Sequence, residues 1–299
     1  MNLKDEIKKL KKEKNALILA HNYQLPEVQE IADFVGDSLE LARTAQKSQA
    51  KIIVLCGVRF MAESAKILSP EKKVLLPRKE AGCPMADMVN ASQLREFKEK
   101  HPGAVVVSYV NTSAEVKAES DLCCTSSNAL KILTRLEAEK IIFVPDQNLA
   151  SYCQRFVKKQ IIPWDGYCYV HTRFSAQEVK KAKEKIPEAV LIVHPECTPE
   201  VIDLADYVLS TGQMVKFCRE AREKKFLIGT EEGLIYRLKK ENPDKKFFSA
   251  GTAKVCANMK LTRLQDVYLS LLEEKHPIEL PSEVIFRAKK ALEQMARYV

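Results

Sequence analysis

The feature that most constrains the fold is an internal repeat, in which one pattern occurs three times along the 299-residue chain. Each copy opens with an apolar run that ends in a short polar segment, at residues 17–23, 105–111 and 190–196, so the copies are offset by 88 and 85 residues. In this register three columns hold identical residues and a fourth holds hydroxyl residues. The columns are Glu27, Glu115 and Glu200; Val28, Val116 and Val201; Asp33, Asp121 and Asp206; and Ser38, Ser126 and Thr211. The repeat predicts three similar supersecondary units.

Each copy continues with further strands and helices in the same order. Second strands are expected at 53–55, 141–143 and 226–228, and third strands at 74–76, 161–162 and 247–248. Helices are expected at 3–14, 59–68, 92–100, 147–157, 175–185, 232–240 and 261–275. Apolar strands that alternate with helices indicate parallel sheets covered on both faces. We therefore expect an α/β fold of three pseudo-equivalent three-layer αβα domains around a pseudo-threefold axis. The predicted domains are 1–85, 86–170 and 171–258, followed by a C-terminal helical segment at 259–299.

Composition excludes several classes of protein. With 46% hydrophobic and 29% charged residues, the chain can bury cores and is not disordered or fibrous. No apolar run approaches the ~18–20 residues that a membrane span needs, and the charged N-terminus has no signal-peptide core, so we expect a cytoplasmic protein without a membrane partner. The net charge of +8 is carried largely by Lys interleaved with Glu, which favours a solvated surface over a nucleic-acid site.

Nine cysteines are present, and no two of them form a CxxC motif. Cys83, Cys168 and Cys256 occupy matched places at the end of each repeat, with spacings of 85 and 88 residues. Under threefold packing their thiols would meet at one point, where they could hold a [4Fe-4S] cluster with one open iron or a zinc ion with three thiolate ligands. A single buried Cys is more often structural, but the shared repeat position favours ligation. We interpret the other six, Cys56, Cys123, Cys124, Cys153, Cys197 and Cys218, mostly as packed thiols, with Cys197 the one expected near the site.

The polar segments at the strand ends hold the candidate catalytic residues, because ligands of parallel sheets bind beyond the carboxyl ends of the strands. His21 and His194 follow apolar strands directly. Glu196 is a candidate general acid or base whose pKa burial would raise, although it could instead cap the helix expected near 199–205. Tyr23 and Tyr109 could donate a proton or hold a carbonyl oxygen.

The hydroxyl column, Ser38, Ser126 and Thr211, recurs ahead of helices. Hydroxyls and free backbone N–H groups at such places bind carboxylate or phosphate oxygens, and equally they cap helices. No P-loop, GxGxxG or HExxH motif occurs, so nucleotide hydrolysis and zinc proteolysis have no support.

Several segments together resemble the quinolinate synthase family, the iron–sulfur enzymes of de novo NAD synthesis. They are residues 20–23 (AHNY), 36–38 (GDS), 82–88 (GCPMADM), 109–113 (YVNTS), 194–197 (HPEC) and 210–214 (STGQM). The resemblance runs from about residue 15 to residue 260. It implies three pseudo-equivalent α/β domains around a central [4Fe-4S] cluster.

The resemblance also implies a reaction and a set of site residues. The reaction condenses iminosuccinate with dihydroxyacetone phosphate to quinolinate, with loss of phosphate and two waters, and it links the protein to the aspartate-oxidising enzyme that supplies iminosuccinate. The implied cluster ligands are Cys83, Cys168 and Cys256. The implied substrate contacts are His21, Ser38, Tyr109, Val110, Asn111, Ser126, His194, Pro195, Glu196 and Thr211, with Tyr23 aiding proton transfer.

One departure concerns redox control. Many family members carry CxxCxxC near the last ligand, whereas residues 255–259 read VCANM, which puts a disulfide switch there in doubt. Two other functions share the predicted cluster. One is another [4Fe-4S]-dependent hydro-lyase, which needs no phosphate pocket, and the other is a non-catalytic iron–sulfur sensor, which needs neither Glu196 nor the hydroxyl column.

Overall fold

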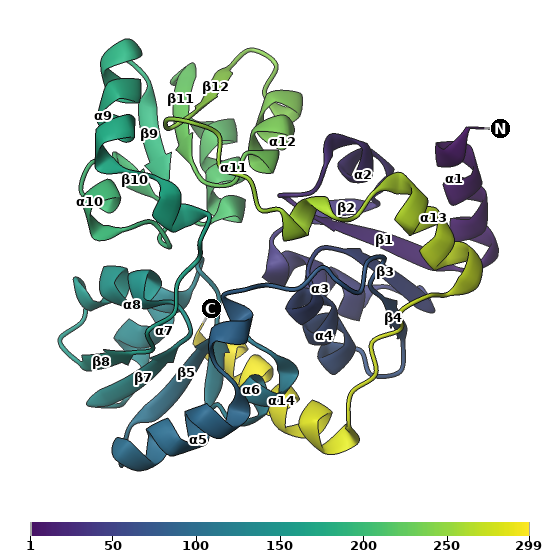
Figure 1. The fold of residues 1–299 in the computed structure, drawn as a ribbon, viewed down its shortest axis with the longest axis horizontal. Coiled ribbons are helices and arrows are strands. Elements are labelled where there is room, and N and C mark those ends of the chain that lie inside the picture. The colour runs from purple at the N-terminus through teal and green to yellow at the C-terminus, as the bar shows by residue number, and fades with distance from the viewer. Residues whose placement is uncertain (1, 299) are drawn as a thin grey trace.

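The computed structural model describes residues 2–298, which form three lobes around a common centre, each built on a four-stranded parallel sheet (Figure 1). The first sheet has the order β2 (Phe34–Gly36), β1 (Ala16–His21), β3 (Ile52–Cys56), β4 (Lys73–Leu75). The second has the order β6 (Leu122–Cys124), β5 (Val105–Tyr109), β7 (Lys140–Val144), β8 (Gln160–Pro163). The third has the order β10 (Tyr207–Val208), β9 (Val190–Val193), β11 (Lys225–Gly229), β12 (Lys246–Ser249).

The helices repeat with the same spacing. The first unit contains α1 (Leu3–Glu13), α2 (Pro26–Ile31), α3 (Ser38–Lys47) and α4 (Arg59–Leu68). The second contains α5 (Ala91–Lys100), α6 (Ala114–Ala118), α7 (Ala129–Arg135) and α8 (Gln147–Gln154), and the third contains α9 (Ala176–Lys185), α10 (Pro199–Ile202), α11 (Thr211–Glu220) and α12 (Gly233–Glu241). The chain ends with α13 (Leu264–Glu273), α14 (Ser282–Gln294) and the 3-10 turn η4 (Met295–Tyr298). All the expected helices are present, and their ends differ from the predicted ones by three residues at most.

Alternate residues of each central strand point to opposite faces, and both faces are covered by helices. In the first unit Ile18 of β1 is fully buried in the cluster that holds α1, α2 and α13, whereas the adjacent Leu19 is buried against α3 and α4. In the third unit Leu191 lies with α9 and α10, and Ile192 with α11 and α12. The predicted three-layer αβα architecture is confirmed.

The identical columns of the repeat have structural roles. In each unit the aspartate accepts the backbone N–H of the central strand: Asp33 from Ile18 (2.9 Å), Asp121 from Val106 (2.7 Å) and Asp206 from Leu191 (2.7 Å). The three valines, Val28, Val116 and Val201, are fully buried. The matched aspartates therefore secure the beginning of each sheet, far from the ends at which ligands bind.

A further matched column consists of Lys72, Lys159 and Lys245. Each ammonium group donates to three backbone carbonyls at the end of α3, α7 or α11, respectively. These carbonyls have no partner within the helix, and a cation there also complements the helix dipole. The same device therefore closes the same helix in all three units.

The structure adds one strand per unit that the sequence pattern did not predict. These strands, β2, β6 and β10, follow directly after the aspartate column and contain only two or three residues. A strand this short shows no alternation of polar and apolar residues, so its only sequence signal is its place in the repeat.

The C-terminal segment returns to the first two units. Helix α13 packs against α1 and β3, and α14 packs against α6, β6 and α4. Figure 1 shows α14 beside α6. Buried apolar residues on one face of the first sheet and one face of the second form a continuous cluster that includes Ala288 and Leu292 of α14, whereas the other faces have clusters of their own. The domain boundaries at 85, 170 and 258 remain predictions. Nowhere in residues 2–298 does a helix have the length and apolar character needed to cross a bilayer.

Candidate active site

A cavity of about 80 Å³ lies where the three units meet. All the predicted site residues line it except Pro195. The lining includes His21, Tyr23, Ser38, Cys83, Tyr109, Val110, Asn111, Ser126, Cys168, His194, Glu196, Thr211 and Cys256. Residues from equivalent strand ends therefore converge on one centre, as the repeat predicts.

The central strand of each unit brings these residues together, because its carboxyl end lies at the cavity. His21 and Tyr109 are the last residues of β1 and β5, and His194 follows β9 directly. Pairing in register aligns these ends within each sheet, for example His21 with Gly36. His21 and Tyr109 are thus carried on strands and Ser38 and Thr211 on helices, whereas the other predicted lining residues lie in the loops between elements.

Each predicted ligand cysteine is half-buried, unpaired, and followed by a short 3-10 turn. The turns are η1 (Ala86–Met88), η2 (His171–Arg173) and η3 (Asn258–Lys260). Backbone N–H groups at or just before these turns donate to the thiols, from Ala86 to Cys83, from His171 to Cys168 and from Met259 to Cys256. Burial raises the pKa of Cys83 to about 12, and these hydrogen bonds act in the opposite direction by favouring the thiolate.

The spacing of the sulfur atoms limits what the thiols can hold. Within residues 2–298, the three cysteines do not form a group whose sulfur atoms all lie within 4.8 Å of one another. A tetrahedral zinc ion with Zn–S bonds of about 2.3 Å would place its sulfur ligands about 3.8 Å apart. The three thiols are therefore not preassembled around a single ion. A closer group does exist in Cys168, His171 and Glu196.

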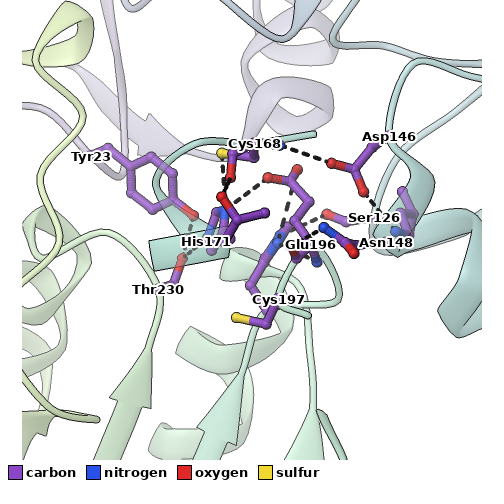
Figure 2. A network of polar contacts seen from close by, with 12 residues as sticks. Tyr23, Ser126, Asp146, Asn148, Cys168, His171, Glu196, Cys197 and Thr230 are labelled. Carbon is purple, nitrogen blue, oxygen red and sulfur yellow. Dashed lines mark hydrogen bonds and ion pairs between the residues drawn. The ribbon is translucent and has the colours of Figure 1, made fainter. Parts of the chain in front are cut away.

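Glu196 is at the centre of a network that joins all three units (Figure 2). One carboxylate oxygen accepts the Tyr109 hydroxyl at 2.6 Å, and the other lies 2.8 Å from Nδ1 of His171. The helix α10 has Thr198 at its N-cap and no side-chain cap, so Glu196 does not cap that helix. The carboxylate is thus directed into the site.

The expected rise in the pKa of Glu196 is wrong. Burial alone does raise it, but the imidazoles of His194 and His171 and the hydrogen bond from Tyr109 outweigh burial and lower the pKa below its usual range. Glu196 is therefore ionised at neutral pH. Burial, and next the charge of Glu196, raise the pKa of Tyr23 and Tyr109 well above the usual value, so both hydroxyls stay protonated.

The two strand-end histidines have the same tautomer. The N–H of Tyr23 donates to Nδ1 of His21 at 3.2 Å, and the N–H of Glu196 donates to Nδ1 of His194 at 3.3 Å. Burial is the largest cause that lowers the pKa of each imidazole to about 3, so both rings are neutral at pH 7. Nδ1 is then the acceptor and Nε2 carries the proton, which His194 directs to the Ser126 hydroxyl at 3.3 Å.

His171 is a site residue that the sequence reasoning missed. It lies 3.2 Å from the sulfur of Cys168 through Nδ1 and 2.8 Å from the Thr230 hydroxyl through Nε2, and its ring stacks on His194 at 4.5 Å. Thr230 also contacts the hydroxyl of Tyr23 at 2.5 Å. The other repeats have Ala86 and, by the same count from the cysteine, Met259 at this position, so the repeat gave no signal. The one sequence signal that could have identified His171 was its position three residues after the predicted ligand Cys168.

The hydroxyl column does not cap helices. The N-caps of α3 and α11 are Asp37 and Ser210, which leaves Ser38 and Thr211 in the first turn. The hydroxyl of Thr211 accepts from Asn22 at 3.1 Å. All three hydroxyl residues line the cavity, at or near the N-terminal ends of helices.

Asn111 offers a free acceptor to a ligand. Its Oδ1 atom is buried and has no hydrogen-bond partner among the described residues. A buried amide oxygen without a partner is costly, which points to a ligand that donates to it.

The six remaining cysteines, Cys56, Cys123, Cys124, Cys153, Cys197 and Cys218, are all fully buried. Their interpretation as packed thiols is confirmed. Cys197 follows Glu196, but its sulfur contacts the carbonyl of Gly229 at 3.5 Å, and the residue does not line the cavity.

Comparison with known proteins gives a consistent result. The family model described as quinolinate synthetase A protein matches residues 5–297. A quinolinate synthase of Alkaliphilus metalliredigens (strain QYMF) is 57% identical over 295 residues, covering 98% of this chain and 97% of the relative. Quinolinate synthases of Dehalococcoides mccartyi (strain CBDB1) and Geobacter sp. (strain M21) are 54% and 53% identical, each over 98% of this chain and over 97% and 96% of the relative, respectively.

Proposed function

The chain belongs to the quinolinate synthase family of enzymes, and from this we propose that it condenses iminosuccinate with dihydroxyacetone phosphate to form quinolinate. The atoms balance when one phosphate and two waters are released. The observation that carries the proposal is the single cavity lined by thirteen of the fourteen predicted site residues. A non-catalytic sensor has no need of the Glu196 network or of the hydroxyl residues.

Cys83, Cys168 and Cys256 are the proposed ligands of a [4Fe-4S] cluster. The choice over zinc is supported by three thiols that accept backbone N–H groups and are not preassembled around a single ion. When bound, such a cluster with one iron free of protein ligands supplies a Lewis acid for loss of a hydroxyl group.

Substrate oxygens are proposed to bind to Ser38, Ser126 and Thr211. Helices α3 and α11 begin beside two of these hydroxyls, and helix N-termini favour phosphate and carboxylate groups. Asn111 Oδ1 would accept a donor of the substrate, such as an imine N–H or a hydroxyl. Val110 lies beside Asn111 and Pro195 lies between His194 and Glu196. Of the two, only Val110 lines the cavity.

Proton transfers are proposed to use Glu196 and its neighbours. The ionised carboxylate can accept a proton from carbon, and Tyr109, at 2.6 Å, can stabilise it or return a proton. Tyr23 reaches the same network through Thr230 and His171. His21 and His194 are neutral, and each is proposed to present its Nε2 donor to substrate oxygens.

The test is to incubate the anaerobically purified protein with both substrates and to measure quinolinate and free phosphate. The proposal predicts one phosphate for each quinolinate. A hydro-lyase acting on another hydroxy acid would release no phosphate. Absence of quinolinate from iron-loaded protein contradicts the proposal.

The reaction also places constraints on the protein's surroundings. An enzyme that oxidises aspartate must supply the unstable imine, so we propose a functional link between the two. Nine free cysteines fit a reducing compartment, which supports a cytoplasmic location.

A further inference from the structure

Two buried carboxylates occupy equivalent positions of the second and third units. Asp146 follows β7 and Glu231 lies just after β11, and they are 85 residues apart, the offset of the repeat itself. Both side chains are fully buried. Neither was singled out by the sequence reasoning, and neither belongs to the proposed proton-transfer residues.

Each carboxylate accepts the same pair of backbone N–H groups, and Glu231 also pairs with the ammonium group of Lys260 at 3.0 Å. One oxygen of Asp146 accepts the N–H of Leu149 at 2.6 Å, in the first turn of α8, and the other accepts the N–H of Cys168 at 3.2 Å. Figure 2 shows Asp146 directed to Cys168. One oxygen of Glu231 accepts the N–H of Gly233 at 2.7 Å, at the beginning of α12, and the other accepts the N–H of Cys256 at 3.1 Å.

Helix capping alone does not explain this arrangement. One carboxylate oxygen is enough to cap a helix, and a capping side chain can be exposed to solvent. Here the second oxygen is used on a cysteine distant in sequence, 22 residues from Asp146 and 25 residues from Glu231. A backbone hydrogen bond already joins each cysteine loop to the beginning of α8 or α12. The N–H of Gln147 donates to the carbonyl of Gly166, and the N–H of Glu232 donates to the carbonyl of Lys254. The carboxylates add a contact at the cysteine itself.

The first unit lacks this contact. Its equivalent position is Val58, which precedes α4 and has no side-chain cap, although the shared backbone bond from Arg59 to Ala81 is present. The Cys83 loop is instead held from the third unit, where the side-chain amide of Asn258 donates to the carbonyl of Gly82 at 2.9 Å. Cys83 therefore serves as an internal reference.

We propose that Asp146 and Glu231 are positioning residues that hold the backbone of Cys168 and Cys256, respectively, so that their sulfur atoms face the metal group. This inference rests on the proposed function for the identity of that group. Groups that orient metal ligands commonly change metal affinity about 10–100-fold when removed.

The first arm of the test uses the full chain after its iron has been removed. Iodoacetamide alkylation of each cysteine is followed by peptide mass analysis in wild type, Asp146→Ala and Glu231→Ala. We expect Asp146→Ala to accelerate alkylation of Cys168 alone, and Glu231→Ala that of Cys256 alone, each several-fold. Asp146→Asn and Glu231→Gln keep an acceptor oxygen and should lie closer to wild type, and they provide readable variants if the alanine variants do not fold.

The second arm measures iron release to a chelator from the anaerobically purified holoprotein. Both alanine variants should lose iron about 10-fold faster. The matched control is Glu63→Ala, since Glu63 is also buried and accepts a backbone N–H, that of Ala114 at 2.9 Å, but holds no cysteine. It should lower the melting temperature without changing either readout.

The two arms separate the possible failures. Equal acceleration at all three cysteines, or iron loss that simply follows the melting temperature as in Glu63→Ala, overturns the positioning role. Selective alkylation in a chain that never binds iron leaves the positioning role intact and contradicts the proposed cofactor instead.

Discussion

Equivalent positions of the three units carry different side chains at the centre of the site. The position that ends the central strand is His21, Tyr109 or, one residue beyond the strand, His194, and two residues later the chain has Tyr23, Asn111 or Glu196. The three units thus place equivalent backbone positions around the site, but the side chains at those positions differ, so each unit contributes different chemical groups.

Glu196→Gln tests the proposed proton acceptor. The amide keeps the size of the side chain but cannot accept a proton from carbon, so turnover should fall ~100-fold or more, in line with general base catalysis. Iron content and the melting temperature should stay close to those of wild type. Near-normal quinolinate formation across the pH range would mean that protons are carried elsewhere, at Tyr23 or His21.

Ser38→Ala and Thr211→Ala test the anion contacts. Loss of one charge-assisted hydrogen bond should weaken apparent substrate binding by about 1–3 kcal/mol while iron content is unchanged. The measurement is KM for each substrate. Unchanged KM values in both variants would exclude these hydroxyls from binding.

His21 gives the protein a dependence of stability on pH. Burial, and next the charge of Lys260, lower the pKa of His21 to about 3 in the folded chain, against 6.5 for a free imidazole. Between these values the unfolded chain binds a proton that the folded chain does not, so stability is lost as the pH falls below 6.5. At pH 5 the loss is about 2 kcal/mol.

The measurement compares melting temperatures of the iron-free chain at pH 7 and pH 5. His21→Asn should lose less stability over this interval than wild type, since Asn does not titrate. Parallel losses would show that His21 is charged in the folded protein.

The sequence predicts the roles of single residues less completely than it predicts helices and strands. Cys83, Cys168 and Cys256 could be expected at one cavity because the repeat aligns them. His171 and Thr230 could not, because their contacts depend on loops from different units meeting in space. The pKa of Glu196 was misjudged for the same reason, since burial was visible in the sequence and the donors facing the carboxylate were not.

At the scale of elements, the same bonds recur in each unit and account for the regularity of the repeat. The aspartate column begins each central strand, and the lysine column closes one helix of each unit. Long helices and buried strands could be located from the sequence because their apolar patterns are strong. The edge strands, such as β10 with two residues, were too short to be detected.

Lys245→Met tests the helix-closing lysines. Removal of the ammonium group leaves buried carbonyls at the end of α11 without a donor and should lower the free energy of unfolding by about 2–3 kcal/mol. The control is Lys246→Met, at the exposed neighbouring position of β12. If chemical denaturation gave the same change in the free energy of unfolding for both substitutions, the contacts of the Lys245 ammonium group would not contribute to stability.

At the scale of the whole molecule, the three units are not held equally. Helix α14 joins the first two units through a common apolar cluster, whereas the third unit has its own clusters and meets the others around the cavity. Contacts across this junction include the hydroxyl of Tyr109 with Glu196 and that of Tyr23 with Thr230. The site is therefore complete only when all three units are assembled.

The threefold arrangement brings Cys83, Cys168 and Cys256 to one cavity, where we propose that they hold one metal group. The most direct measurement is the iron and sulfide content and visible absorption of anaerobically purified protein, compared among wild type, the three single Cys→Ser variants and Cys153→Ser as a buried control. Wild type and Cys153→Ser should each hold four iron and four sulfide per chain, as a [4Fe-4S] cluster requires, and each of the three ligand variants should lose the absorption. A full cluster in all three ligand variants would show that these cysteines do not hold it.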